Sequence, residues 1–119
     1  MTLSVDAVLQ RMKTAFADPA GAGDNLLVAA PGAGLKIVVY GYFLLNNAAT
    51  AQNVRFRSAA NSKGPLMVFP AAGAVPNTPI FQNPTGFPLF ECNANEALNL
   101  NLSAATAVGV MVQYAVVPV

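Results

Sequence analysis

The stretch that decides the fold is residues 96–117, EALNLNLSAATAVGVMVQYAVV. Its first part alternates leucines with polar residues: Leu98, Leu100 and Leu102 with Asn99, Asn101 and Ser103. Because successive side chains of a β-strand point to opposite faces, this pattern predicts a strand with one dry and one wet face. Residues 108–117 are apolar on both faces apart from Gln113. Such a strand is covered on both sides, by a second sheet or by another chain. The small residues 104–106 between the two strands allow a hairpin turn.

The composition predicts that the chain associates with a partner. Its 119 residues suit one domain with a single two-layer core. Hydrophobic residues make up 55% and charged residues 9%, whereas a typical soluble domain has about 25% charged residues. A small monomer of this kind exposes apolar surface, and the simplest remedy is a permanent partner, most often a second copy. The net charge of +1 gives no electrostatic sign of nucleic-acid binding.

The apolar segments do not have the pattern of a membrane span. A spanning helix needs about 20 consecutive apolar residues, but residues 35–45 are too few and are followed by Asn46 and Asn47. The uncharged run 64–90 contains six prolines, which a helix would not tolerate. The N-terminal residues lack the continuous apolar region of a secretory signal. The lone Cys92 fits a protein made in a reducing cytosol.

Residues 4–17 have the spacing of an amphipathic helix. Its apolar positions recur every three or four residues: Val5, Val8, Leu9, Met12 and Phe16. Ser4 is suited to the N-cap, and Pro19, Gly21 and Gly23 end the pattern. The stripe either packs on the β-core of the same chain or docks on a neighbouring subunit. We therefore divide the chain into an arm, residues 1–23, and a β-sandwich domain, residues 24–119.

Short strands are predicted along the rest of the chain. They cover residues 25–30, 35–45, 53–58, 66–69 and 89–92, before the two strands described above. In the longest, strict alternation places Ile37, Val39, Phe43 and Leu45 on one face, and Gly41 marks a bulge or a close backbone approach. About seven or eight strands with one terminal helix predict an all-β fold, an antiparallel β-sandwich of jelly-roll or Greek-key type.

The residues offer little catalytic chemistry. The chain has no histidine, so a Ser-His-Asp triad and the commonest transition-metal ligand are absent. Glu91 and Glu96 flank a turn and could approach each other as a glycosidase pair would, but rim charges beside a turn explain them more simply. Cys92 follows Glu91 and has no base, so it is interpreted as a small core or interface residue. We predict no catalytic residue, no cofactor, no metal site and no enzymatic activity.

Two arginines are the other polar feature. In residues 53–58, Val54 and Phe56 fall on one face and Arg55 and Arg57 on the other. Two guanidinium groups on one strand face could hold a carboxylate or phosphate. A solvated or ion-paired surface is the simpler interpretation, because charged residues are usually exposed.

Two further segments carry a resemblance: NPTGFPLFE at 83–91 and EALNLNLS at 96–103. With residues 35–45, 54–58, 63–66 and 108–116, they resemble small virion proteins of tailed bacteriophages, and the resemblance covers residues 35–119. The family is similar to capsid decoration, or cement, proteins, which are β-sandwiches that sit as homotrimers on the capsid. The segment 71–88 is longer and richer in proline than that pattern.

The resemblance implies a structural, non-enzymatic role. The chain would assemble as a homotrimer on the virion capsid after synthesis in the bacterial cytoplasm, bind the major capsid protein and stabilise the shell, with no nucleic-acid or membrane partner. Candidate residues for the oligomer and capsid interfaces are Val5, Val8, Leu9, Met12, Phe16, Phe81, Phe87, Tyr40, Tyr42 and Met111. The alternative is a receptor- or carbohydrate-binding module of a phage fibre or spike, for which the candidate residues are Tyr40, Tyr42, Asn99 and Asn101.

Overall fold

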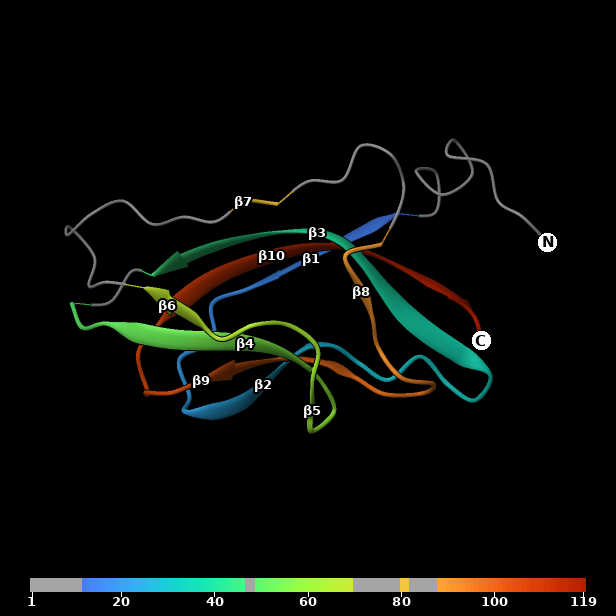
Figure 1. Ribbon diagram of the computed structural model, residues 1–119, viewed down its shortest axis with the longest axis horizontal. Coiled ribbons are helices and arrows are strands. Elements are labelled where there is room, and N and C mark those ends of the chain that lie inside the picture. Colours follow the sequence, from blue (N-terminus) through green and yellow to red (C-terminus); the bar gives the residue numbers. More distant parts are fainter. Residues whose placement is uncertain (1–11, 47–48, 70–79, 82–87) are drawn as a thin grey trace.

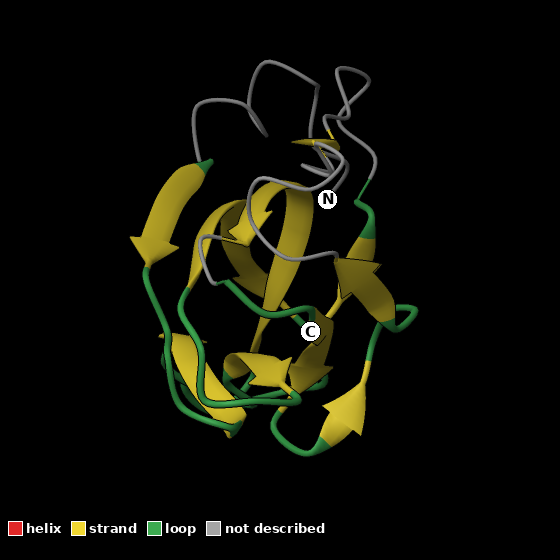
Figure 2. Cartoon of the chain, turned by 90° about the vertical axis from the view of Figure 1, so that its left-hand side faces the viewer, coloured by secondary structure: helices red, strands yellow, loops and turns green. Residues whose placement is uncertain are grey.

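Two antiparallel β-sheets lie against each other and share one apolar core (Figure 1). The computed structural model describes residues 12–46, 49–69, 80–81 and 88–119, and of residues 80–81 only the backbone. Among these residues there are ten strands and no helix (Figure 2). The predicted all-β class is therefore confirmed for the part of the chain that the structure describes.

The strands alternate between the two sheets along much of the sequence. Their bounds are β1 (Lys13–Ala17), β2 (Gly23–Val28), β3 (Leu35–Asn46), β4 (Gln52–Ser58), β5 (Asn61–Ser62), β6 (Met67–Phe69), β7 (Ile80–Phe81), β8 (Phe90–Glu91), β9 (Leu98–Leu102) and β10 (Val108–Pro118). Sheet A has the order β1-β10-β3-β7, and β8 also pairs with β3. Sheet B has the order β2-β9-β4-β5, and β6 also pairs with β4.

The core lies between the sheets and takes one face of each. From sheet A and its connections come Ile37, Val39, Leu44, Val108, Val110, Val112 and Cys92; from sheet B come Val54, Phe56, Phe69, Leu98, Leu100 and Leu102. The leucines of β9 are at most 1% exposed, which confirms the dry face predicted from their alternation. The Phe56 ring lies 5.2 Å from that of Tyr42 and 5.5 Å from that of Phe90, between centroids.

A β-bulge in β3 changes which residues face the core. Gln113 of β10 lies opposite Gly41, but the next residue, Tyr114, lies opposite Val39, so Tyr40 is an extra residue in β3. Of the two alternatives that the sequence left at Gly41, a bulge or a close backbone approach, the structure shows a bulge, with Tyr40 next to that glycine as the extra residue. The alternation of faces shifts there, because a one-residue offset moves all later side chains to the other face.

The shift corrects the predicted faces of β3 beyond the bulge. Ile37 and Val39 face the core as expected, but past the bulge Leu44 is the buried residue, at 0% exposure. Phe43 and Leu45, predicted to share the face of Ile37, are instead 36% and 38% exposed on the outer face of sheet A.

The structure also corrects the predicted helix in part. Residues 13–17, assigned to the end of that helix, form strand β1, which pairs antiparallel with β10 through Lys13 opposite Tyr114. Ala15 and Ala17 pack toward the core, while Phe16 points away from it and is 77% exposed. Edge pairing with β10 thus decides the conformation of this segment. Residues 4–11 of the predicted helix lie outside the described residues.

The connection between β9 and β10 is not a hairpin. β9 belongs to sheet B and β10 to sheet A, so residues 103–107 cross from one layer to the other. Gln52, only 1% exposed, holds this crossing. Its Nε2 donates to Oγ1 of Thr106 at 2.7 Å and to the carbonyl of Ala104 at 2.8 Å, while its Oε1 accepts from Oγ of Ser103 at 2.7 Å. Both the nitrogen and the oxygen of this buried amide are hydrogen-bonded, and these bonds fix the crossing. The segment therefore does not need the Asn-Gly sequence that is typical of tight hairpin turns.

Candidate functional site

The outer face of sheet A carries a row of exposed apolar side chains. Phe16 of β1 lies opposite Met111 of β10, and Met111 lies opposite Phe43 of β3. These three residues, which we name the apolar row, are 77%, 44% and 36% exposed. Leu45, 38% exposed, extends it along β3. Three neighbouring strands thus present large apolar side chains to solvent at one level of the sheet, which is typical of an association surface.

The other end of the same outer face is buried. Val38, Tyr40 and Ala115 form a second, smaller cluster, against which Met12 and Val117 pack. Burial raises the pKa of the Tyr40 hydroxyl, and the negative charge of Glu91 raises it further. Apart from Gln113, β10 is therefore apolar on both faces over residues 108–117, as the sequence predicted, and β3 also carries apolar side chains on both faces.

The two tyrosines predicted for an interface or a sugar site lie in different environments. Tyr42 faces the core against Phe56, and its hydroxyl donates to Sδ of Met67 at 3.7 Å. Burial also raises the pKa of the Tyr42 hydroxyl. Tyr40 is on the opposite face of β3, at 6% exposure. The structure does not bring them together as one exposed aromatic platform.

The remaining interface candidates are placed only in part. Met12 is partly buried. Phe81 lies in β7, whose backbone pairs with β3 through Tyr42, but its side chain is outside the described residues. Val5, Val8, Leu9 and Phe87 also lie outside them. Of the predicted set, the structure brings Phe16 and Met111 into contact positions, and Phe43 and Leu45 are the members that the sequence pattern missed.

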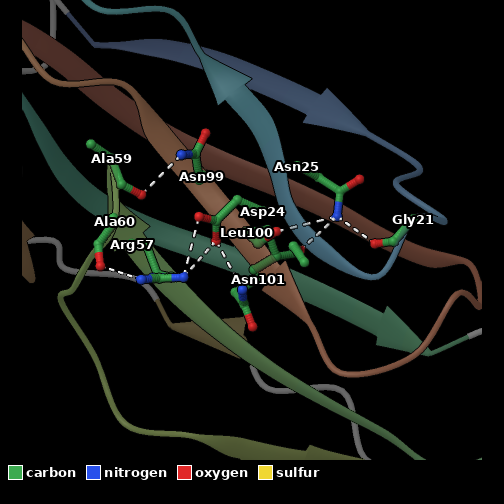
Figure 3. Close-up of polar contacts among 10 residues, drawn as sticks. Gly21, Asp24, Asn25, Arg57, Ala59, Ala60, Asn99, Leu100 and Asn101 are labelled. Atoms are coloured by element: carbon green, nitrogen blue, oxygen red, sulfur yellow. Dashed lines mark hydrogen bonds and ion pairs between the residues drawn. The ribbon is translucent and has the colours of Figure 1, made fainter.

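A polar cluster lies on the outer face of sheet B (Figure 3). Nη1 of Arg57 binds both carboxylate oxygens of Asp24, at 3.1 and 3.2 Å, and Nδ2 of Asn101 donates to Oδ1 of Asp24 at 2.9 Å. Nη2 of Arg57 donates to the carbonyl of Ala60. The cluster therefore links β2, β9 and β4, with the carboxylate of the edge strand reaching across the middle strand to the arginine.

The turn before β2 places Asp24. Nδ2 of Asn25 donates to the carbonyl of Gly21 at 2.8 Å and to that of Gly23 at 3.1 Å (Figure 3). Gly23 has a φ of 90°, a left-handed conformation that favours glycine. These contacts fix the start of β2 so that Asp24 lies opposite Asn101. No feature of the sequence predicted this pairing with Arg57, because the two residues are 33 positions apart.

Arg55 is in a different state from Arg57. It lies opposite Asn101, on the same outer face as Arg57. Its Nε atom is buried and has no hydrogen-bond partner among the described residues, and the same is true of Nε of Arg57. Arg55, Arg57, Ser62, Leu66 and Asn101 line a pocket of about 270 Å³, which we name the arginine pocket. Of the two hypotheses for these arginines, ion pairing describes Arg57, while Arg55 makes no ion pair within the described residues.

The two glutamates that flank a turn bind different partners. Glu91 forms an ion pair with Lys36, Oε2 to Nζ at 2.9 Å. Oε1 of Glu96 accepts hydrogen bonds from Oγ of Ser58 at 2.8 Å and from Nδ2 of Asn93 at 3.0 Å. These two bonds, the Ser58 bond first, lower the pKa of the Glu96 carboxyl. A low pKa keeps Glu96 ionised, which is the opposite of what a general acid needs.

Cys92 lies in the core, next to Ser58. It is 3% exposed, and burial raises the pKa of its thiol. A buried thiol of raised pKa is a poor nucleophile, so the residue packs as the sequence predicted. Within the described residues, no group of three or more Cys, Asp or Glu side chains is placed to hold a metal ion. The same part of the chain contains no helix that could cross a membrane.

Comparison with known proteins adds no family assignment. No protein-family model, no curated protein sequence and no solved structure matches this chain.

Proposed function

We propose that this chain is a non-enzymatic structural protein that assembles with copies of itself, in the role of a capsid decoration protein of a tailed bacteriophage. The apolar row on sheet A carries the proposal. Burying a large apolar side chain contributes about 1.5–3 kcal/mol, so covering Phe16, Met111 and Phe43 between copies would favour association. The low charge content, 9%, removes much of the repulsion that keeps small domains apart.

We also propose that the two sheets form a jelly roll. The support is the strand order, in which the first and last long strands, β1 and β10, are neighbours in sheet A, and β2 and β9 are neighbours in sheet B. The strands β1, β2, β3 and β4 lie alternately in sheets A and B, and β9 and β10 lie in opposite sheets, as in two interleaved Greek keys. Jelly rolls are common in viral capsid domains, which agrees with the resemblance of residues 35–119 to phage virion proteins.

The assembly that we propose is a homotrimer on the capsid surface. A trimer needs a heterologous interface that closes into a ring, so the apolar row would meet a different surface of the next copy. The major capsid protein is the proposed second partner, and neither nucleic acid nor a membrane is part of the proposal. The carbohydrate- or receptor-binding alternative stays a prediction. It has less support, because Tyr40 and Tyr42 lie on opposite faces of β3 and do not form one aromatic platform.

The native mass of the protein tests the self-association. We expect a trimer at micromolar concentration, and we expect Met111→Lys to shift it toward the monomer by placing a charge in the centre of the apolar row. The matched control is Leu26→Lys, since Leu26 is 62% exposed on sheet B and lies outside the row. A wild-type monomer, or a Met111→Lys variant that stays trimeric, would contradict the proposal.

Virion association tests the capsid role separately. Particles of a phage whose genome encodes this chain are purified on a density gradient. We expect the chain to band with the major capsid protein in a fixed ratio and to be released as an oligomer by mild denaturant. Its absence from purified particles would contradict the decoration role even if the protein is trimeric.

A further inference from the structure

The arginine pocket exists because β4 loses its partner strand for a short distance. Ser62 of β5 lies opposite Arg57, and Met67 of β6 lies opposite Val54. Between these two pairings, the backbone N–H of Lys63 still donates to the carbonyl of Phe56 at 3.0 Å, but residues 64–66 leave the sheet, so no strand lies beside β4 at Arg55 on that edge. The pocket opens at this position and is lined on one side by Leu66, which is 49% exposed.

Arg55 lines this pocket and has one unused hydrogen-bond donor. Its Nε is buried, and no described residue accepts a hydrogen bond from it or forms an ion pair with its guanidinium group. Within the same part of the chain, Nε of Arg57 also has no partner, although both Nη atoms of that residue are bonded. Buried polar groups are almost always paired, so unpaired cationic donors that line a pocket point to an acceptor that arrives from outside.

The local charge limits what that acceptor can be. Arg55 and Arg57 contribute two positive charges, and Asp24, bound to Arg57, contributes one negative charge. The remaining single positive charge is neutralised by one singly charged anion, whereas a phosphate dianion would leave an excess negative charge next to Asp24. The fork of N–H donors on a guanidinium group matches the two oxygens of a carboxylate.

The size and lining of the pocket narrow the ligand further. Its volume of about 270 Å³ is below the range of about 300–1,000 Å³ typical of sites for drug-sized ligands. The pocket therefore has room for one small group, and Leu66 offers that group an apolar wall. We propose that the arginine pocket binds one carboxylate on an aliphatic stem, as a glutamate side chain of a protein docking on sheet B presents it.

This inference goes beyond self-association through the apolar row. The row lies on the outer face of sheet A, and the pocket lies on the outer face of sheet B, on the far side of the core. The small-molecule test below does not depend on oligomeric state. Failure of one proposal therefore leaves the other standing.

The test follows the arginine Nε–H resonances of ¹⁵N-labelled protein by NMR. The probes are N-acetyl-glutamate amide, the neutral N-acetyl-glutamine amide and inorganic phosphate. We expect the glutamate probe to shift the Arg55 and Arg57 resonances saturably, and the glutamine probe to bind at least tenfold more weakly. No saturable shift with the glutamate probe, or tighter binding of phosphate, would overturn the proposal.

Variants locate the site. Arg55→Gln should weaken binding of the glutamate probe at least tenfold. Lys13→Gln removes the same charge from sheet A and should leave the binding unchanged. Leu66→Asp changes an exposed residue and places a carboxylate in the pocket, so it should also weaken the probe at least tenfold. Because Leu66 is exposed, the Leu66→Asp variant still tests the site if Arg55→Gln does not fold. Equal weakening by Arg55→Gln and Lys13→Gln, or unchanged binding to Leu66→Asp, would contradict the assignment.

Discussion

Oγ of Ser58 donates a hydrogen bond of 2.8 Å to Oε1 of Glu96, and this bond ties the end of β4 to the residues that lead into β9. Ser58 is fully buried, and its Oγ also accepts from the backbone N–H of Asn93 at 2.9 Å. One hydroxyl thus connects the last residue of a core strand with the turn at 93–95.

Removing this hydroxyl should raise the pKa of Glu96. The Ser58 bond is the largest cause of the lowered pKa, and the longer bond from Asn61, at 3.3 Å, is a smaller one. We expect Ser58→Ala to move the pKa of Glu96 toward its ordinary value more than Asn61→Ala does, measured by NMR titration of the side-chain carboxyl. The reverse order would show that the Ser58 bond is not the main cause.

The same pKa predicts how stability changes in acid. A carboxyl whose pKa is lower in the folded state stabilises the fold above its ordinary value, 4.5, and loses that contribution as the pH falls through the folded pKa. The free energy of unfolding should therefore fall below pH 4.5, and less steeply in Glu96→Gln. Urea unfolding at several pH values measures this. If the free energy of unfolding fell equally steeply with pH in the wild type and in Glu96→Gln, ionisation of Glu96 would not contribute to stability.

The bulge in β3 predicts unequal effects for two adjacent leucines. Leu44→Ala should cost about 2–5 kcal/mol, because Leu44 is fully buried in the core. Leu45→Ala should cost under about 1 kcal/mol, since Leu45 is on the outer face and 38% exposed. Urea unfolding at low protein concentration compares them. If the faces of β3 alternated without a break from Ile37, Leu45 would be buried and its loss would cost more than the loss of Leu44. The two variants therefore test the bulge directly.

Gln52 should be needed for the crossing between the sheets. Gln52→Leu removes the acceptor of the Ala104 N–H, at 3.0 Å, and the donor to Oγ1 of Thr106. Each buried group left unpaired costs about 1–3 kcal/mol. We expect lower stability and faster amide hydrogen exchange at Ala104, with the Leu100 amide as the internal control. Unchanged exchange at Ala104 would mean that the turn holds without this side chain.

The thiol of Cys92 should report on unfolding. Because it is 3% exposed and burial raises its pKa, it should react with a disulfide reagent at pH 8 more slowly than the unfolded chain, by about two orders of magnitude or more. Thr14→Cys, on the exposed side of β1, supplies a control thiol that should react fast in the folded protein. Rapid modification of Cys92 in wild-type protein would contradict its burial.

The sequence predicted the features that depend on local alternation. The buried leucines of β9 and the outward arginines of β4 follow directly from the two-residue period. It did not predict the outward position of Phe43, because the faces were assigned by strict alternation past Gly41, where β3 has one extra residue opposite β10. It assigned residues 13–17 to a helix because Met12 and Phe16 are four apart, whereas pairing with β10 determines the strand.

The candidate site was predictable to a similar extent. The sequence placed Arg55 and Arg57 on one face, but their different partners depend on Asp24, which comes from a strand on the far side of β9. The pocket depends on where residues 64–66 leave the sheet. Neither the pairing of Asp24 with Arg57 nor the position of the pocket has a local signal in the sequence.

The pairing of β1 with β10 also has a consequence for the speed of folding. Lys13 lies opposite Tyr114, about 100 residues later in the sequence, and β10 sits between β1 and β3 in sheet A. Folds dominated by such distant pairings close long loops before gaining contacts, and they fold in about milliseconds to seconds. Until β10 arrives, β1 and β3 expose unpaired edges, so refolding at high protein concentration should compete with aggregation.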